Sequence, residues 1–599
     1  MCGIASIFNY RGGAPVELEE LVRIRDGMDC RGPDGHGEWV SDDRRVALAH
    51  RRLAIIDLSD LAAQPMSTPD GALVITFNGE IYNFRALRDR LERRGHSFTT
   101  QSDTEVLLHL YMEHGADMVH ELRGMFAFAL FDARRGGVLL ARDHFGIKPL
   151  YYADDGATVR AASEVRALLR GSGVDRSAEP AAHAGFFLWG HVPEPYTMYR
   201  GIRALPAGST MWIDAAGASA PVKYADVTAL LRNAEERAPR LHPGELEQRL
   251  GDALRDTVRH HLVADVPVGV FLSAGIDSST LTALASENGG TLKTVTLGFT
   301  EFRGTAFDET PLAEEVARSC GADHQTVWIG STDFKEQSNR LLERMDQPSV
   351  DGVNSYFVAR AAAKTGLKVA LSGLGGDELF GGYPSFRDVP RLVRALGGVP
   401  GTETVGRGLR FIAAPIVGQL TSPKYASVLE YGGTWGGAYL LRRGMYMPWE
   451  LPDVMDADLA REGWRELQQF ARLDAIVDGI EAPRLKVSAL EASWYMRNQL
   501  LRDTDWASMS HSLEVRVPLV DWTFWRAVAP LIAACPGSLP KRAIAETPRR
   551  PLPAAVLSRP KTGFEIPTRE WLVGEHGAKY AGRGLRGWAR FVYDRFAQR

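Results

Sequence analysis

The hydrophobic pattern of the chain changes near residue 245, and this change limits the folds that the chain can adopt. Before it, short apolar runs alternate with turn residues, as in GIASIFNY and ALVITFNGEIYNF, with helical patterns such as DTEVLLHLYMEHG between them. After it, apolar runs lie next to helical patterns, as in VPVGVFLS, KTVTLGF and KVALSG. The first pattern is typical of antiparallel sheets covered by helices, and the second of a parallel sheet with helices on both faces.

The sequence therefore predicts an α+β domain over residues 1–212, a linker over 213–244 and an α/β domain over 245–599 whose last part is helical. A length of 599 residues fits more than one domain. The net charge of −4 offers no basic surface for a nucleic acid, and no apolar run is long enough for a membrane span. Four scattered cysteines indicate neither a disulfide framework nor a zinc site. We expect a cytoplasmic protein that acts on small molecules.

The chain begins with MCGIASIFNY, so a cysteine follows the initiator methionine directly. Removal of the methionine would leave a thiol and an α-amino group on Cys2, and an amine with a pKa near about 8 can serve as the base that activates the thiol. Attack on an amide also needs oxyanion donors, which Asn78 and Gly79 in FNGEIYNF can supply. Each motif also has an ordinary interpretation, since a lone cysteine is often a core residue and Asn-Gly is a strong hairpin signal.

Two further motifs follow apolar runs of the predicted parallel sheet. In SAGIDSS, small residues allow a tight turn before a helix that begins near Ser278, a geometry that favours a bound phosphate. In LSGLGGDELFGGY, Asp377 lies in a run of glycines. Loops at the carboxyl ends of parallel strands converge on one crevice, so Asp277 and Asp377 could hold Mg²⁺ on the phosphates of ATP. The ordinary interpretation of such a small-residue turn is simple packing.

Ten segments in order resemble the glutamine-dependent asparagine synthetases, within the class II, N-terminal-nucleophile glutamine amidotransferases. They are MCGI, RGPDG, LAHRRLAIIDLS, FNGEIYNF, SDTEVLLHLY, ARDHFGIKPLYY, SAGIDSS, SGLGGDE, RDTDWASMSHSLEVRVPLVD and RPKTGFEIP. The resemblance implies a glutaminase domain followed by an ATP-pyrophosphatase synthetase domain. It also implies hydrolysis of glutamine through a thioester and passage of ammonia inside the protein. The ammonia would then amidate an adenylated carboxylate, which in this family is aspartate.

The resemblance also implies roles for individual residues. At the glutaminase site, Cys2 is the nucleophile and Asn78 with Gly79 forms the oxyanion hole. Glutamine is bound through its α-carboxylate by Arg52 and through its ammonium by Glu80 and Asp103, as the complementary charges allow. At the synthetase site, Lys561 is catalytic, Asp277 and Asp377 hold Mg²⁺, and ATP contacts Leu272, Ser273, Gly275, Asp277, Ser278, Leu297, Ser372 and Gly373.

Three positions depart from the family pattern. Leu374 stands where the family motif SGEGxDE has glutamate, and Trp506 stands where arginine is common, while Ala274 replaces a glycine with one added methyl group. Leucine can neither accept a proton nor form a salt bridge, which places aspartate in doubt as the acceptor.

The alternatives are another carboxylate, such as a sugar acid or a specialised metabolite, and a non-catalytic sensor of glutamine and ATP. Intact Cys2, Asp277 and Asp377 argue against the sensor. The phosphoribosyl and glucosamine phosphate amidotransferases do not fit because they lack SAGIDSS. The expected small-molecule partners are glutamine, ATP and a carboxylate acceptor. The oligomeric state stays open, with a homodimer as one option.

Overall fold

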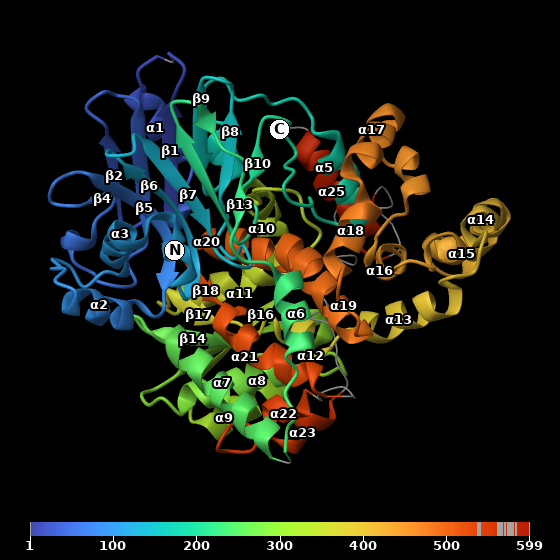
Figure 1. Ribbon diagram of the computed structural model, residues 1–599. Coiled ribbons are helices and arrows are strands. Elements are labelled where there is room, and N and C mark those ends of the chain that lie inside the picture. Colours follow the sequence, from blue (N-terminus) through green and yellow to red (C-terminus); the bar gives the residue numbers. More distant parts are fainter. Residues whose placement is uncertain are drawn as a thin grey trace.

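Two antiparallel sheets form the N-terminal part of the chain (Figure 1). The computed structural model describes residues 2–597 apart from 13, 243, 536–540, 560–566, 568–570, 572–579 and 581–583, and apart from the side chains of 415, 416 and 418–420. The first sheet has the strand order β10-β8-β9-β1-β3-β2, and the second has the order β12-β11-β7-β6-β5-β4 with β13 also paired to β11. The strands are β1 (Gly3–Asn9), β2 (Gly35–Val40), β3 (Val46–Arg52), β4 (Met66–Ser67), β5 (Leu73–Ile81), β6 (Gly124–Asp132), β7 (Gly137–Arg142), β8 (Tyr151–Asp154), β9 (Thr158–Ala162), β10 (Arg203–Ala204), β11 (Ser209–Asp214), β12 (Gly217–Ala218) and β13 (Val222–Lys223).

The two sheets pack face to face because alternate residues of each strand are apolar on the inner side. Ile4 and Phe8 of β1 share one buried cluster with Val74 of β5 and Ala127 of β6. The outer faces are covered by helices, with α1 (Leu18–Asp26) and α4 (Val165–Leu168) on the first sheet and α2 (Phe84–Arg93) and α3 (Asp103–His114) on the second. This arrangement confirms the predicted α+β fold of the N-terminal part.

A parallel sheet forms the centre of the second part, with the strand order β16-β15-β14-β17-β18. Its strands are β14 (Val268–Phe271), β15 (Lys293–Phe299), β16 (Asp323–Ile329), β17 (Val369–Leu371) and β18 (Glu514–Arg516). Helices cover both faces, which confirms the predicted α/β fold. They are α7 (Glu245–His261), α8 (Ile276–Ser286), α9 (Thr310–Cys320), α10 (Ser331–Arg344), α11 (Val353–Lys364), α20 (Arg502–Met509) and α21 (Trp522–Ala533). Because β14 and β17 are neighbours and parallel, the loops that follow them lie side by side.

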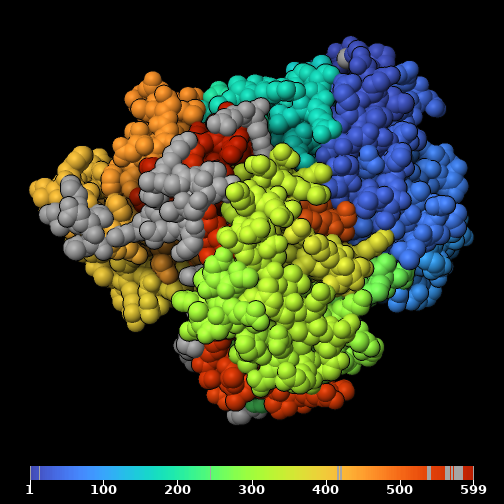
Figure 2. All heavy atoms as spheres, turned by 180° about the vertical axis from the view of Figure 1, so that it is seen from behind, coloured from blue at the N-terminus to red at the C-terminus, as the bar shows by residue number. Residues whose placement is uncertain are grey.

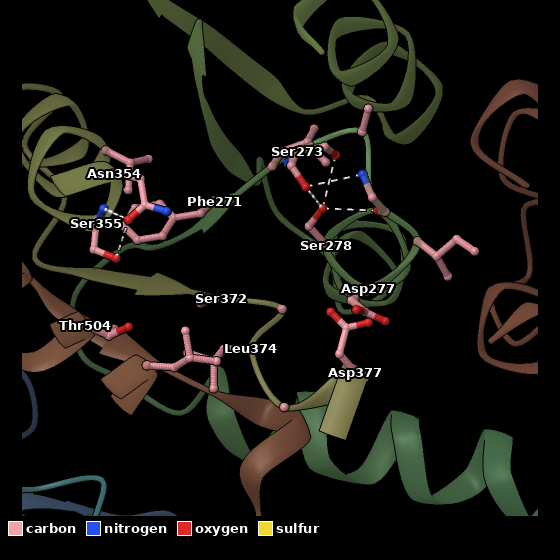
Figure 3. Close-up of a pocket in the computed structure, with 18 of the residues that line it drawn as sticks. Phe271, Ser273, Asp277, Ser278, Asn354, Ser355, Ser372, Leu374, Asp377 and Thr504 are labelled. Carbon is pink, nitrogen blue, oxygen red and sulfur yellow. Dashed lines mark hydrogen bonds between the residues drawn. The ribbon is translucent and has the colours of Figure 1, made fainter. Parts of the chain in front are cut away.

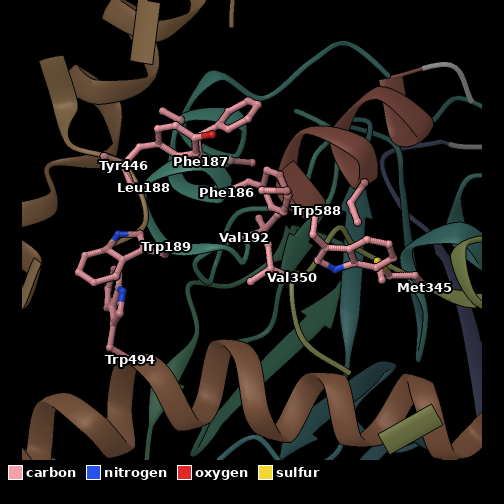
Figure 4. Packing of buried hydrophobic residues seen from close by; sticks show 14 of the residues in the cluster. Phe186, Phe187, Leu188, Trp189, Val192, Met345, Val350, Tyr446, Trp494 and Trp588 are labelled. Carbon is pink, nitrogen blue, oxygen red and sulfur yellow. The ribbon is translucent and has the colours of Figure 1, made fainter. Parts of the chain in front are cut away.

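The predicted helical part forms a separate lobe that packs against the N-terminal part. Its helices are α13 (Ser385–Leu396), α14 (Thr402–Leu420), α15 (Val428–Tyr431), α16 (Trp435–Arg443), α17 (Ala457–Leu467), α18 (Gln469–Val477), α19 (Pro483–Leu490), a π-helical segment (Glu491–Leu501) and α25 (Arg586–Ala597). The short helices α12 (Gly376–Phe380), α22 (Arg542–Ala545) and α23 (Ala554–Ser558) contact the α/β part, α12 through α21, α22 through α7 and α8, and α23 through α8. Aromatic residues of α5 (Pro180–Trp189) enter its core, where Trp189 packs on Trp494 and Phe187 on Tyr446 (Figure 4). The two halves of the chain therefore share one buried cluster.

The N-terminal sheet continues past residue 212, where the predicted linker begins. β11 ends at Asp214, and β12 and β13 pair with it up to Lys223. The following helix α6 (Val227–Glu236) packs its apolar side on α21. The short edge strands were not predicted because this stretch is rich in turn residues. The division into domains at these residues stays a prediction. Among the described residues, no helix combines the length and apolar character that a membrane crossing needs.

The shared aromatic cluster should determine the stability of the joined halves. Phe187 is 1% exposed and its ring lies 4.5 Å from that of Tyr593. We expect Phe187→Ala to lower the free energy of unfolding by about 3–5 kcal/mol, the usual cost of removing a buried phenyl ring. Urea denaturation measures this loss. The matched control is Phe411→Ala, because Phe411 is 72% exposed; equal destabilisation by both substitutions would contradict the assignment.

Candidate active sites

A small pocket at the start of β1 collects the predicted glutaminase residues. It is lined by Cys2 directly before β1, Arg52 at the end of β3, Gly79 and Glu80 on β5, and Asp103 at the start of α3. The pairing of β1 with β3 and the packing of the two sheets bring these segments together. Residues from four segments that are far apart in the sequence therefore surround one space.

Asn78 lies next to Cys2 and has amide hydrogens available. Its Oδ1 accepts a hydrogen bond of 2.9 Å from the backbone nitrogen of Cys2, and its buried Nδ2 has no hydrogen-bond partner in the described part of the chain. Gly79 is confined, since a Cβ there would lie 2.2 Å from the carbonyl oxygen of Met125. The Asn78 side chain can therefore donate to an oxyanion that develops beside Cys2.

The surroundings of Cys2 keep its thiol neutral. Burial raises the pKa of the Cys2 thiol. The Sγ atom lies 3.9 Å from the carbonyl oxygen of Leu53. A thiol in this environment needs a base to become nucleophilic.

Arg52 is held at the rim of the pocket by backbone carbonyls. Its guanidinium donates to the carbonyl oxygens of Asp57 at 2.5 Å and Ser59 at 2.9 Å. On the opposite side, Asp103 Oδ2 accepts from the backbone nitrogen of Ile81 at 2.9 Å, and burial raises the pKa of Asp103 to about 6. The pocket thus presents a cation and a carboxylate, as binding of an amino acid requires.

Glu80 has a partner that the sequence did not reveal. Its Oε2 lies 3.2 Å from Arg516 Nη2, and Arg516 Nε donates to Glu514 at 2.6 Å. Burial and the neighbouring Glu514 raise the pKa of Glu80 well above its ordinary value. Because Arg516 belongs to β18, this buried cluster connects the glutaminase pocket directly to the parallel sheet.

A second and larger pocket, with a volume of about 370 Å³, lies at the carboxyl ends of β14 and β17 (Figure 3). Its size is that of a small-molecule site. All predicted ATP and metal residues line it, namely Leu272, Ser273, Gly275, Asp277, Ser278, Leu297, Ser372, Gly373 and Asp377. Lys561 lies outside the described residues.

The loop between β14 and α8 is folded tightly by its own serines. Ser278 Oγ donates to the carbonyl oxygen of Ser273 at 3.0 Å, and the backbone nitrogen of Gly275 donates to Ser273 Oγ at 3.2 Å. These bonds hold the chain against the N-terminus of α8, where backbone N–H groups and the helix dipole favour an anion. The loop can therefore receive the phosphates of a nucleotide.

Asp277 and Asp377 face each other across the two loops, and Lys541 lies between them (Figure 3 shows the two aspartates). The loops approach so closely that a Cβ on Gly376 would lie 2.6 Å from Asp277 Cγ. Lys541 Nζ is 2.5 Å from Asp277 Oδ2 and also pairs with Asp377. Burial alone would lower the pKa of Lys541, but the two aspartates raise it above its ordinary value.

The two aspartates fit Mg²⁺ that is held mainly by substrate phosphates. Mg²⁺ commonly takes one or two carboxylates and completes its shell with phosphate and water oxygens. Within the described residues, no cluster of three or more acidic, histidine or cysteine side chains could hold a metal alone. Lys541 stands in LPKRAIAE, a stretch without a recognisable motif, and only its position between the two carboxylates identifies it.

Leu374 and Glu378 follow β17 at the edge of the same pocket. Glu378 is buried, its Oε1 accepts a hydrogen bond of 2.8 Å from Tyr383 Oη, and burial raises its pKa to about 7. Glu378 can therefore carry or release a proton near neutral pH, whereas Leu374 contributes only apolar surface.

Comparisons with known proteins agree with this two-site arrangement. Residues 1–225 match the family described as glutamine amidotransferase domain, and residues 249–593 match the family described as asparagine synthase. The combination defines a class of enzyme in which an amidotransferase domain serves a ligase domain. The chain belongs to the glutamine-hydrolysing asparagine synthetase family.

Three curated relatives illustrate the range of this similarity. Asparagine synthetase [glutamine-hydrolyzing] 1 of Bacillus subtilis is 31% identical over 595 residues, which cover 96% of this chain and 88% of the relative. Asparagine synthetase B of Escherichia coli is 31% identical over 411 residues, covering 65% and 66% of the two chains. Amidase chry2 of Gibberella zeae is 30% identical over 431 residues, covering 65% and 60%.

Lys541 provides a test of the second pocket. Lys541→Gln keeps the length of the side chain but removes its positive charge, leaving Asp277 and Asp377 to repel each other. We expect nucleotide-dependent pyrophosphate release to fall at least 100-fold, while glutamine hydrolysis changes less than twofold. Both rates can be measured on one preparation. Unchanged pyrophosphate release would contradict a role for Lys541 in this site.

Proposed function

We propose that this chain hydrolyses glutamine at Cys2 and uses the released ammonia to amidate a carboxylate that ATP activates in the second pocket. The observation that carries the proposal is the separation of the predicted residues into two pockets of one chain, each with a coherent chemistry. A sensor without activity would need neither a thiol beside an amide nitrogen that has no partner among the described residues nor paired aspartates beside a phosphate loop.

At the first site, the Cys2 thiolate attacks the amide carbon of glutamine. The α-amino group that is exposed when the methionine is removed takes the thiol proton, since its pKa near about 8 suits neutral pH. Asn78 Nδ2 and Gly79 stabilise the oxyanion. The amine returns the proton to the leaving nitrogen, ammonia departs, and water hydrolyses the thioester to glutamate and free thiol.

At the second site, an oxygen of the acceptor carboxylate attacks the α-phosphate of ATP, and pyrophosphate leaves. Lys541 and the serine loop offset the negative charge of the phosphates, and Asp277 with Asp377 would hold Mg²⁺, which supplies further charge neutralisation. Ammonia then attacks the acyl carbon of the adenylate, AMP leaves, and a base takes one proton. Glu378, with a pKa raised to about 7, lines this pocket and is a candidate for that base.

The names of the relatives make aspartate the first acceptor to examine. Similarity of about 30% also extends to a protein named an amidase, so this level of identity does not fix the acceptor. Leu374 cannot salt-bridge to the ammonium of aspartate or accept a proton from incoming ammonia. We therefore expect aspartate to be a poor substrate compared with a bulkier carboxylate. The described cysteines form no disulfide, which suits a cytoplasmic enzyme.

Two variants test whether glutamine hydrolysis and carboxylate activation take place at separate sites. Cys2→Ala removes the nucleophile and should abolish glutamine hydrolysis, while pyrophosphate release with added ammonium chloride and acceptor should stay within about twofold. Asp277→Asn removes one negative charge from the phosphate site, so it should abolish pyrophosphate release and leave glutamine hydrolysis within about twofold. Glutamine hydrolysis and pyrophosphate release are measured for both variants. If either variant is folded but has lost both activities, the proposal of two separate sites is contradicted.

A further inference from the structure

The second pocket has an end that is chemically different from its phosphate end. Asn354, Ser355, Leu374 and Thr504 lie on the side away from Asp277 and Asp377 (Figure 3). Asp351, Leu500 and Asp503 also line the pocket and are neighbours of these residues in sequence. We call this region, formed by Asp351, Asn354, Ser355, Leu374, Leu500, Asp503 and Thr504, the acceptor end.

Acidic groups of the acceptor end are held in place by their own loop. Asp351 Oδ1 accepts from the backbone nitrogen of Gly352 at 2.8 Å, and Asp351 lines the pocket. Asp503 accepts hydrogen bonds from Ser349 Oγ and, at 2.9 Å, from Trp506 Nε1. Burial raises the pKa of Asp351, and it raises the pKa of Asp503 to about 7.

The Trp506 indole supports this loop without adding charge. Gly352 has a φ of +87°, and a Cβ there would lie 2.6 Å from Trp506 Cζ2. Trp506 is buried against the loop and satisfies Asp503 as a neutral donor. An aromatic side chain therefore helps to shape the acceptor end. The buried Arg502 guanidinium donates to the carbonyl oxygen of Val192 at 2.8 Å and, as a nearby cation, opposes the rise in the pKa of Asp503.

The described lining of the pocket contains two cations, and both pair with carboxylates outside the acceptor end. Its cations are Lys541 and Arg559. Lys541 pairs with Asp277 and Asp377, and Arg559 Nη2 lies 3.2 Å from Glu309 Oε1. A second carboxylate on the acceptor, such as the α-carboxylate of aspartate, would thus enter an acidic region without a cation in the described lining, at a substantial desolvation cost.

Hydroxyl groups suit this end better than charged groups. A hydroxyl donates to a carboxylate and accepts from an amide or another hydroxyl without carrying charge into a partly buried site. Asp351 and Asp503 offer acceptors, and Thr504 offers both functions. Asn354 Oδ1 already accepts from the backbone nitrogen of Ser355 at 2.7 Å, so Asn354 offers the donors of its Nδ2. Leu374 with Leu500 offers an apolar wall. Alternating polar edges and an apolar face are properties of a sugar ring.

We infer that the acceptor is a hydroxylated monocarboxylic acid of the sugar-acid class, whose hydroxyls bind Asp351, Asn354 and Thr504 and whose ring packs against Leu374. The inference rests on the proposed function, because it names the acceptor of the same ATP-dependent amidation. Its carboxylate points toward the phosphate end, where it attacks ATP. The product is the primary amide of the sugar acid, with AMP and pyrophosphate released.

A substrate panel tests the class of acceptor. Pyrophosphate release is followed with ATP, ammonium chloride and one of five acids: glucuronate, galacturonate, UDP-glucuronate, cyclohexanecarboxylate or aspartate. Cyclohexanecarboxylate has a comparable ring without hydroxyls. We expect at least one of the three uronates to exceed both cyclohexanecarboxylate and aspartate at least 100-fold in kcat/KM. Aspartate equal to or better than every uronate, or no release with any uronate, overturns the inference.

The same panel separates this inference from the proposed function. Pyrophosphate release with aspartate alone would overturn the sugar-acid class and leave the ATP-dependent amidation intact. ADP and phosphate as products, or no acid-dependent release at all, would overturn the proposed function itself. Intact glutamine hydrolysis in parallel shows that the preparation is active.

Two variants test which residues bind the acceptor. Asp351→Asn keeps one side-chain oxygen, which can still accept from the backbone nitrogen of Gly352, but replaces the other oxygen by an NH₂ donor. We expect KM for the uronate to rise about tenfold and KM for ATP to change little. Leu374→Glu is the converse change and should lower uronate activity while not impairing, and even improving, aspartate activity. An unchanged KM for the uronate in Asp351→Asn would contradict its contact with the hydroxyls.

Discussion

A buried arginine fixes the nucleophile-bearing end of the chain against the second half of the protein. Arg31 Nε donates to the carbonyl oxygen of Cys2 at 3.0 Å, and its two terminal nitrogens donate to Asp505 at 2.7 and 3.1 Å. Its side chain is fully buried. Such a pair contributes little net stability, because its desolvation offsets its attraction, but breaking it leaves an uncompensated charge. Arg31 therefore favours a single way of docking the two halves, as does Arg516 with Glu80, and both pockets depend on that docking.

The sequence predicted both sheet architectures because hydrophobic periodicity differs between antiparallel and parallel sheets. Local motifs pointed to Cys2 and Gly79, and the family resemblance pointed to Arg52; the structure places all three around one pocket, while their roles stay predictions. Lys541 was missed because its role depends on two loops that meet only in the folded chain. The edge strands after residue 212 were missed because short, turn-rich strands have no periodicity to detect. The aromatic core of the helical lobe joins segments too distant for a sequence pattern to connect.

The two pockets differ in the charges that surround them, as glutamine hydrolysis and ATP-dependent activation of a carboxylate require. The glutaminase pocket combines a neutral thiol with carboxylates whose pKa values are raised by burial. The second pocket has Lys541 between the paired aspartates at its phosphate end, whereas its acceptor end is lined by acidic and neutral polar residues. Ammonia made at the first site is useful at the second only if it stays unprotonated on the way, which favours an enclosed route. We propose that Leu374 and Trp506 adapt the second site to its acceptor, since Leu374 lines the acceptor end and Trp506 donates to Asp503.

The most direct test of coupled sites follows the amide nitrogen itself. The enzyme is given glutamine labelled with ¹⁵N in the side-chain amide, ATP, an acceptor that supports pyrophosphate release, and an excess of unlabelled ammonium chloride. Mass spectrometry of the amide product measures its ¹⁵N content. Our account predicts that most of the product carries ¹⁵N despite the unlabelled pool. Dilution of the label to the proportion in solution would show that ammonia escapes before it reacts, and would contradict an internal transfer between the two pockets.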